Sequence, residues 1–153
     1  MLNILLVEDE PGLRESTQFL LESYGHRSDV AENGKIAVEK CSNANDYDLI
    51  LMDVRMPVMN GIEATKAIRQ LEAGKSRTPI VALTAESMEI KERCLAVGMD
   101  EFLPKPLDLN ALEAILHKIS LQCSLSEARL IPELPEDTPT TRSHYHLLLG
   151  EIV

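Results

Sequence analysis

The chain has 153 residues, of which 44% are hydrophobic, and a formal net charge of −10 at pH 7. This size and composition predict one globular domain that can fill its core without disulfides. The negative charge, with no block of Lys or Arg, argues against binding to nucleic acid or to an anionic membrane. Three dispersed cysteines indicate neither a disulfide framework nor a paired-cysteine metal site, so a reducing, cytoplasmic setting is expected.

The first half of the chain alternates short apolar runs with helical patterns. The run at residues 3–7 is bounded by charge, as in a strand buried on both faces of a parallel sheet. It is too short for a membrane span, and the acids that follow it exclude a signal peptide. The expected elements of this half are strands at 3–7, 28–31 and 49–52 and helices at 11–24 and about 36–41.

The second half continues the alternation. Asn60 suits the cap of a helix that begins at Gly61, and Gly98 suits the end of another. The expected elements are helices from Gly61 to Leu71 and from 88 to 96, strands at 80–83 and 101–103, and an amphipathic helix from Leu109 to Ile119. Five repeats of strand and helix predict an α/β fold with a doubly wound, five-stranded parallel sheet.

The composition changes after Ser120. Pro132, Pro135 and Pro139 interrupt a stretch rich in Ser, Thr and acidic residues. We therefore predict a domain at residues 1–120 and an acidic, proline-containing tail or linker at 121–153.

Polar residues follow four of the predicted strands. Glu8 and Asp9 follow the first strand, Asp53 the third, Thr84 the fourth and Lys105 the fifth. Open parallel sheets bind ligands beyond the carboxyl ends of their strands, so these side chains are expected around one crevice. A single charged residue at a strand end usually only marks the point where the chain leaves the core and meets solvent. Three acids, a Thr and a Lys at one edge instead indicate a functional site.

The three carboxylates predict a divalent metal. Clustered carboxylates repel one another, and a hard cation with oxygen ligands relieves this repulsion. Mg²⁺ fits Glu8, Asp9 and Asp53, because it takes one or two carboxylates and completes its shell with water and phosphate oxygens. Lys105 and Thr84 would supply a positive charge and a hydroxyl donor beside the metal. The set therefore predicts a site for a phosphoryl group on a carboxylate.

The same residues form an ordered set of motifs. They are Glu8-Asp9, Met52-Asp53 with Met56-Pro57 and Gly61, Ala82-Leu83-Thr84-Ala85, and Leu103-Pro104-Lys105-Pro106. In order and spacing, residues 2–120 resemble the response-regulator receiver domain of two-component signalling. The resemblance implies a flavodoxin-like or CheY-like sheet in the strand order 2-1-3-4-5.

The resemblance also implies a phosphoacceptor. Asp53 would take a phosphoryl group from a phosphohistidine on a histidine kinase or a histidine phosphotransfer protein. Mg²⁺ would be held by Asp9, Asp53 and the main-chain carbonyl of Arg55, with Glu8 acting through water. The chain would promote its own phosphorylation and dephosphorylation without being an enzyme in the usual sense.

A switch is implied as well. Lys105 would pair with the phosphorylated carboxylate, and Thr84 and the amide of Ala85 would contact the phosphoryl oxygens. Thr84 and Phe102 would then move together and change the surface of the fourth helix, fifth strand and fifth helix. The family also implies a cis peptide before Pro106 and is compatible with a homodimer formed on phosphorylation.

Three other functions remain open. A Mg²⁺ phosphohydrolase with an aspartyl-phosphate intermediate usually has a second Asp where this chain has Arg55. A flavin or nucleotide carrier is disfavoured because Glu8, Asp9 and Glu10 would repel a phosphate. A pseudo-receiver would bind proteins without being phosphorylated. The chain can be a stand-alone receiver or a piece of a hybrid histidine kinase. The runs 80–85 and 102–106 look more like the receivers of hybrid kinases than like those of transcription factors.

Overall fold

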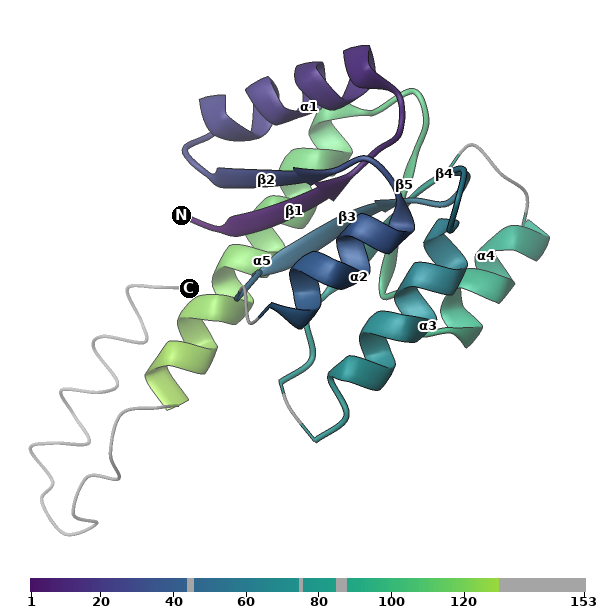
Figure 1. Cartoon of the computed structure of the whole chain (residues 1–153). Coiled ribbons are helices and arrows are strands. Elements are labelled where there is room, and N and C mark those ends of the chain that lie inside the picture. The colour runs from purple at the N-terminus through teal and green to yellow at the C-terminus, as the bar shows by residue number, and fades with distance from the viewer. Residues whose placement is uncertain (44–45, 75, 85–87, 130–153) are drawn as a thin grey trace, which may run out of the picture. The chain divides into compact units, whose positions relative to one another are not determined.

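The computed structural model describes residues 1–43, 46–74, 76–84 and 88–129, in which five strands alternate with five helices (Figure 1). The strands are β1 (Asn3–Val7), β2 (Arg27–Ala31), β3 (Leu49–Asp53), β4 (Ile80–Thr84) and β5 (Glu101–Pro104). The helices are α1 (Pro11–Ser23), α2 (Gly34–Ser42), α3 (Gly61–Leu71), α4 (Met88–Ala96) and α5 (Leu109–Arg129).

The five strands form one parallel sheet in the order β2-β1-β3-β4-β5. Helices α1 and α5 cover one face of the sheet, and α2, α3 and α4 cover the other (Figure 1). The predicted doubly wound fold and strand order are therefore confirmed. The order of the strands reverses between β1 and β3, which is where sheets of this kind bind their ligands.

The core follows from the apolar strands. Every residue of β3 and β4 is buried, as expected for central strands that are covered by helices on both faces. On one face, Leu5, Ile50 and Ile80 pack in a cluster with Ala64 and Ile68 of α3. Burial of such side chains stabilises the fold by roughly 1.5–3 kcal/mol each, which fixes the strands that carry the polar residues at their ends.

Three helices begin at side-chain caps on the carboxyl edge of the sheet. The Glu10 carboxylate accepts from the amides of Gly12 and Leu13 at the start of α1. Asn33 caps α2 and Asn60 caps α3 in the same way. The caps satisfy amides that the first turn of a helix leaves without partners, and they fix the loops around this edge.

Two large apolar side chains lie outside the buried faces of their helices. Helix α1 buries Thr17 and Leu21, whereas Phe19 is 75% exposed. Phe19 is two residues from each of them and so points to the opposite side of the helix. Leu71, the last residue of α3, is 41% exposed, because the helix ends there.

The last helix is longer than predicted. Helix α5 buries Leu112, Leu116 and Ile119 and continues to Arg129, past the predicted domain boundary at residue 120. Met1–Leu121 forms one compact unit, and a second unit begins at Gln122. The tail from residue 130 onward lies outside the described residues, so the division into a domain at 1–120 and a tail at 121–153 stays a prediction. No helix in the described part of the chain is both long and apolar enough to cross a membrane.

Candidate phosphoacceptor site

Two buried carboxylates lie at the ends of neighbouring strands. Asp53 is the last residue of β3 and is 4% exposed, and Glu8 follows β1 and is 2% exposed. The pairing of Val7 with Met52 brings these two strand ends together. The amide of Glu8 donates to the carbonyl of Ala31 at the end of β2, which holds the loop after β1 in place.

Asp9 completes the acidic cluster. Glu8, Asp9 and Asp53 each offer one carboxylate oxygen, and these atoms lie within 4.8 Å of one another. Asp9 is more open to solvent than the other two acids. The structure therefore brings together the three carboxylates that the sequence predicted as metal ligands.

Lys105 is the positive charge of the site. Its ammonium lies 3.0 Å from Oδ1 of Asp53 and 3.1 Å from Oε2 of Glu8. Lys105 follows β5, its amide donates to the carbonyl of Thr84, and its peptide bond to Pro106 is cis, as the family resemblance implied. One ammonium thus contacts carboxylates from two other strand ends.

The electrostatics of the site leave excess negative charge. Burial raises the pKa of Asp53 to about 7, and the nearby charge of Glu8 adds to this effect, while Lys105 opposes it. Burial alone would lower the pKa of Lys105, but its hydrogen bonds to Asp53 and Glu8 raise it overall. Lys105 is therefore charged at neutral pH and only partly neutralises the carboxylates.

This arrangement fits a hard divalent cation. Three carboxylates share a space of a few ångströms, and two of them are buried, so the protein offers oxygen ligands whose repulsion a cation would relieve. Arg55 lies two residues beyond Asp53, and its side chain is exposed. A cavity of about 550 Å³ beside the cluster is lined by both Asp9 and Arg55, which places the predicted fourth ligand residue next to the acids.

Thr84, one of the two residues predicted to contact the phosphoryl oxygens, lies at the same edge. Thr84 is the buried last residue of β4, and the pairing of Asp53 with Leu83 sets it one position beyond the level of Asp53. Ala85, whose amide was predicted to contact the phosphoryl group, lies outside the described residues.

Phe102 occupies the predicted switch position in β5. It is partly buried against the core cluster, and the ammonium of Lys91 lies 5.8 Å from the centre of its ring. This cation–π contact links Phe102 to α4, and it has no signal in the sequence, because Lys91 lies in another element. The movement of Phe102 stays a prediction.

Gly61 forms the tightest backbone contact at the site. Its amide donates to the carbonyl of Val54, and a Cβ at this position would lie 2.2 Å from the carbonyl oxygen of Asp53. Gly34 contacts the carbonyl of Met59 in the same way, with a Cβ distance of 2.5 Å. The first residues of α2 and α3 thus hold the loop after β3 by close approach, which only glycine permits.

Comparison with known proteins shows the family of this chain. The family model described as the response regulator receiver domain matches residues 4–117. The chain belongs to the response regulator receiver domain family.

Curated relatives include both hybrid kinases and single response regulators. The receiver domain is 48% identical over 115 residues to hybrid signal transduction histidine kinase B of Dictyostelium discoideum, covering 68% of this chain but 6% of that protein. It is 40% identical over 119 residues to two-component response regulator 24 of Arabidopsis thaliana, covering 78% of this chain and 84% of that protein. The chain therefore spans only a small part of the hybrid kinases that it matches.

Solved structures give the same result. The receiver domain of a sensor histidine kinase from Pseudomonas aeruginosa, which has a magnesium ion coordinated in its active-site cleft, is 40% identical. Its TM-score is 0.71, over 78% of this chain and 98% of that one. The receiver domain of the response regulator Ssk1, solved with the histidine phosphotransfer protein Ypd1 of Saccharomyces cerevisiae, is 32% identical, with a TM-score of 0.70 over 78% and 87% of the two chains.

The raised pKa of Asp53 predicts how pH changes the stability of the metal-free receiver domain. The folded protein binds a proton at Asp53 more tightly than the unfolded chain, whose value is near 3.8, so the free energy of unfolding falls as pH rises from about 4 to about 7. The Asp53→Asn variant has no ionisable group at this position, so its free energy of unfolding does not fall in this way. We expect it to be more stable than wild type by roughly 2 kcal/mol at about pH 8, with the difference vanishing near pH 4.

Urea unfolding at several pH values, with chelator present, measures this difference. Glu15→Gln on the exposed side of α1 is the matched control and should follow wild type. Added Mg²⁺ should stabilise wild type at about pH 8 more than Asp53→Asn. An Asp53→Asn variant that is less stable than wild type at this pH would show that the pKa of Asp53 is not raised.

Proposed function

We propose that the receiver domain accepts a phosphoryl group on Asp53 from a phosphohistidine, in a reaction that depends on Mg²⁺. The observation that carries this proposal is the ammonium of Lys105 within 3.1 Å of both Asp53 and Glu8, in a cluster with a third carboxylate. The chemistry is phosphoryl transfer to a protein side chain rather than turnover of a small substrate.

The transfer needs one bond to form as another breaks. A carboxylate oxygen of Asp53 attacks the phosphorus of the donor, the P–N bond breaks, and the imidazole leaves with the electron pair and takes up a proton from solvent. Such transfers depend on in-line positioning and on neutralisation of charge, so the chain needs no histidine of its own in the site. Burial of Asp53 restricts the approach to the open side of the crevice.

Each residue of the site has a separate part in this proposal. Lys105 holds Asp53 before transfer and pairs with the new phosphate afterwards. Thr84 and the amide of Ala85 would donate to phosphoryl oxygens. Glu8, Asp9, Asp53 and the carbonyl of Arg55 would hold Mg²⁺, which would offset the charge that gathers on the phosphoryl oxygens.

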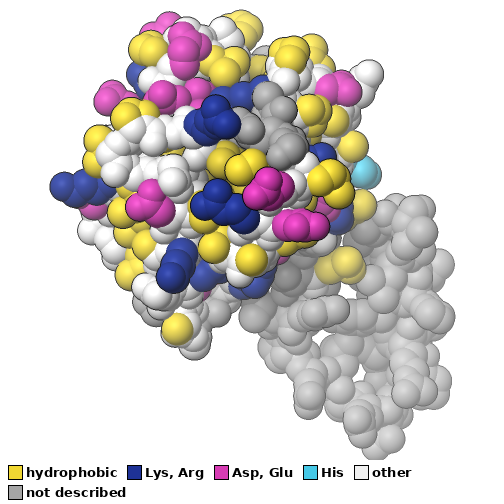
Figure 2. Space-filling view, turned by 90° about the vertical axis from the view of Figure 1, so that its right-hand side faces the viewer, with side chains coloured by type: hydrophobic (Ala, Val, Ile, Leu, Met, Phe, Trp, Pro, Cys, Tyr) yellow, Lys and Arg dark blue, Asp and Glu magenta, His cyan; other side chains and the backbone are white. Residues whose placement is uncertain are grey.

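The output would pass through α4, β5 and α5. Phe102 lies in β5 and contacts Lys91 of α4. A change in the position of Phe102 would therefore alter its contact with this helix. Figure 2 shows the side of the molecule that carries α4 in Figure 1, where hydrophobic side chains lie among basic and acidic ones. Met88 and Leu95 of α4 are exposed. A mixed surface of this kind suits a protein partner, and a second phosphorylated copy is one such partner.

The physiological donor is proposed to be a histidine kinase or a histidine phosphotransfer protein in the cytoplasm. The complex of Ypd1 with the receiver domain of Ssk1 supports this class of partner, and the hybrid kinases support a place in a phosphorelay. Whether the natural context is a hybrid kinase or a separate regulator affects the partner but not the chemistry.

Transfer of radiolabelled phosphate from a phosphorylated histidine phosphotransfer protein tests the donor. We expect label to move to the receiver domain within minutes when Mg²⁺ is present and to stay on the donor when Mg²⁺ is chelated or Asp53 is replaced by Asn. Several donor proteins should be tried, because phosphotransfer partners are specific. Label that moves equally well to Asp53→Asn would refute Asp53 as the acceptor.

A further inference from the structure

A second cavity lies at the other end of β3 from Asp53. It has a volume of about 470 Å³ and is lined by residues from the end of α2, the start of β3 and the end of α3. Ile50 contributes from β3, and Ile68 and Leu71 contribute from α3. This volume is in the range of pockets that hold a small organic ligand. Because the cavity and Asp53 lie at opposite ends of one strand, binding here can be measured separately from phosphorylation.

The floor of this cavity is apolar. Ile50 and Ile68 are each 1% exposed, so they form a fixed base within the core. Cys41 adds its thiol to the wall, and burial, together with the charge of Glu72, raises the pKa of this thiol to about 11. The thiol is therefore neutral at physiological pH and behaves as a small apolar group. Leu71 is partly exposed, so the apolar lining extends to the opening of the cavity.

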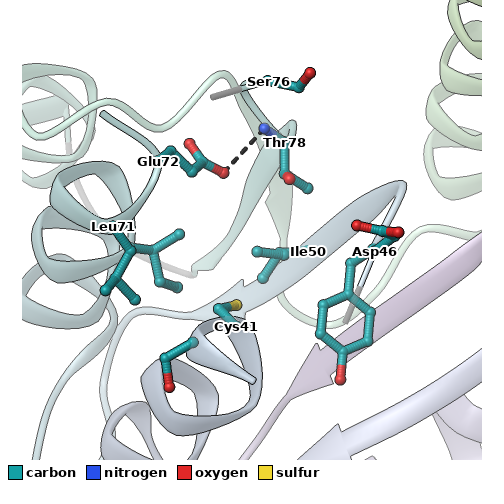
Figure 3. Close-up of a pocket in the computed structure, with 10 residues that line it drawn as sticks. Cys41, Asp46, Ile50, Leu71, Glu72, Ser76 and Thr78 are labelled. Carbon is teal, nitrogen blue, oxygen red and sulfur yellow. Dashed lines mark hydrogen bonds between the residues drawn. The ribbon is translucent and has the colours of Figure 1, made fainter. Parts of the chain in front are cut away.

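The rim carries two carboxylates with different surroundings. Glu72 is already engaged, because it accepts from the guanidinium of Arg69 at 2.6 Å and from the amide of Thr78 at 3.0 Å. The side chain of Asp46 forms no hydrogen bond or ion pair with any residue in the described part of the chain. Figure 3 shows Cys41 and Ile50 between Glu72 on one side and Asp46 on the other. Within the described residues, the rim thus offers one carboxylate that has no partner and can receive a cation.

We propose that this cavity binds a small apolar amine, with its hydrocarbon body against Cys41 and Leu71, above the base formed by Ile50 and Ile68, and its ammonium at Asp46. An ammonium supplies three donors, and Asp46, with the hydroxyls of Ser42 and Ser76 at the same cavity, supplies acceptors. A carboxylate or phosphate ligand would meet two acids and is excluded by charge. A neutral ring would fit the floor but leave Asp46 without a partner.

Phenethylamine is the probe for this proposal. In methyl-labelled protein, titration should give saturable shifts at Ile50, Ile68 and Leu71, with a dissociation constant of about 1 mM or tighter for a ligand of this size. The methyl groups of Leu103 and Leu112, which are buried outside the cluster that contains Ile50 and Ile68, should stay unchanged. Ethylamine, 2-phenylethanol and 3-phenylpropionate separate the contributions of charge and ring, and each should bind at least about 5-fold more weakly.

Two variants decide whether the site is the one proposed. Asp46→Asn should weaken phenethylamine binding by about 5-fold, and Glu15→Gln, an acid removed from the exposed side of α1, should leave it unchanged. The proposal is overturned if the shifts do not saturate, if ethylamine binds as well as phenethylamine, or if the two variants have equal effects. The last two results would mean that the net negative charge of the protein attracts amines without a specific site.

Discussion

Replacing Lys105 by Gln is expected to slow phosphorylation of Asp53 by roughly 10²-fold, the usual effect of removing one charge-stabilising group from such a site. The ammonium of Lys105 contacts Asp53 at 3.0 Å and Glu8 at 3.1 Å, and Gln is polar but one bond shorter and uncharged. Without Lys105, the pKa of Asp53 would rise further, so less of the attacking carboxylate would be ionised at neutral pH. Intact-mass spectrometry of the phosphorylated fraction against time gives the rate.

The same variant should lose stability in the absence of metal. Two buried carboxylates would lie together without a positive partner. We expect this to lower the free energy of unfolding by about 3 kcal/mol at about pH 8. The control is Lys118→Gln, because Lys118 pairs with Glu101 at an exposed position and should contribute less than about 1 kcal/mol. Equal phosphorylation rates in Lys105→Gln and Lys118→Gln would exclude Lys105 from the reaction.

Gly61→Ala is expected to have the second largest effect, through the backbone. The added Cβ would lie 2.2 Å from the carbonyl oxygen of Asp53, a contact that neither element can accept without moving. We expect a loss of about 3 kcal/mol in the free energy of unfolding and, in the protein that remains folded, slower phosphorylation, since the end of β3 must shift.

Gly74→Ala is the matched control for this variant. Gly74 has a positive φ of 81°, but nothing lies within 4 Å of the position that its Cβ would take. Gly74→Ala should lower the free energy of unfolding only through backbone strain, by about 1 kcal/mol, and should not change the phosphorylation rate. A Gly61→Ala protein as stable as Gly74→Ala would show that the close approach to Asp53 is absent. Chemical denaturation and the mass-spectrometric time course measure both quantities.

The sequence was sufficient to predict the sheet and most of the site. Apolar runs identify buried strands, and the residue after each run lies at the carboxyl edge, so Glu8, Asp53, Thr84 and Lys105 could be placed around one crevice before any coordinates. The structure adds that Lys105 contacts Glu8 as well as Asp53. That shared contact depends on the twist and spacing of three strands, which a pattern along the chain does not specify.

Other features depend on contacts between distant elements. The position of Lys91 over Phe102 joins α4 to β5, and the approach of Gly34 to Met59 joins α2 to the loop after β3. Neither follows from local propensity. The exposure of Phe19 could have been predicted from the angle between it and Leu21 on the helix. The extension of α5 was also readable, because no Pro or Gly interrupts residues 120–129.

Whether Asp53 is the phosphoacceptor is tested by intact-mass spectrometry after incubation with acetyl phosphate. Wild type and Asp53→Asn are compared with and without Mg²⁺, and circular dichroism verifies that each sample is folded. We expect the gain of one phosphoryl group in wild type with Mg²⁺ and in no other sample. Folded wild type that gains no phosphoryl group from fresh donor, or an adduct that persists in Asp53→Asn, would contradict the assignment of Asp53 as a phosphoacceptor.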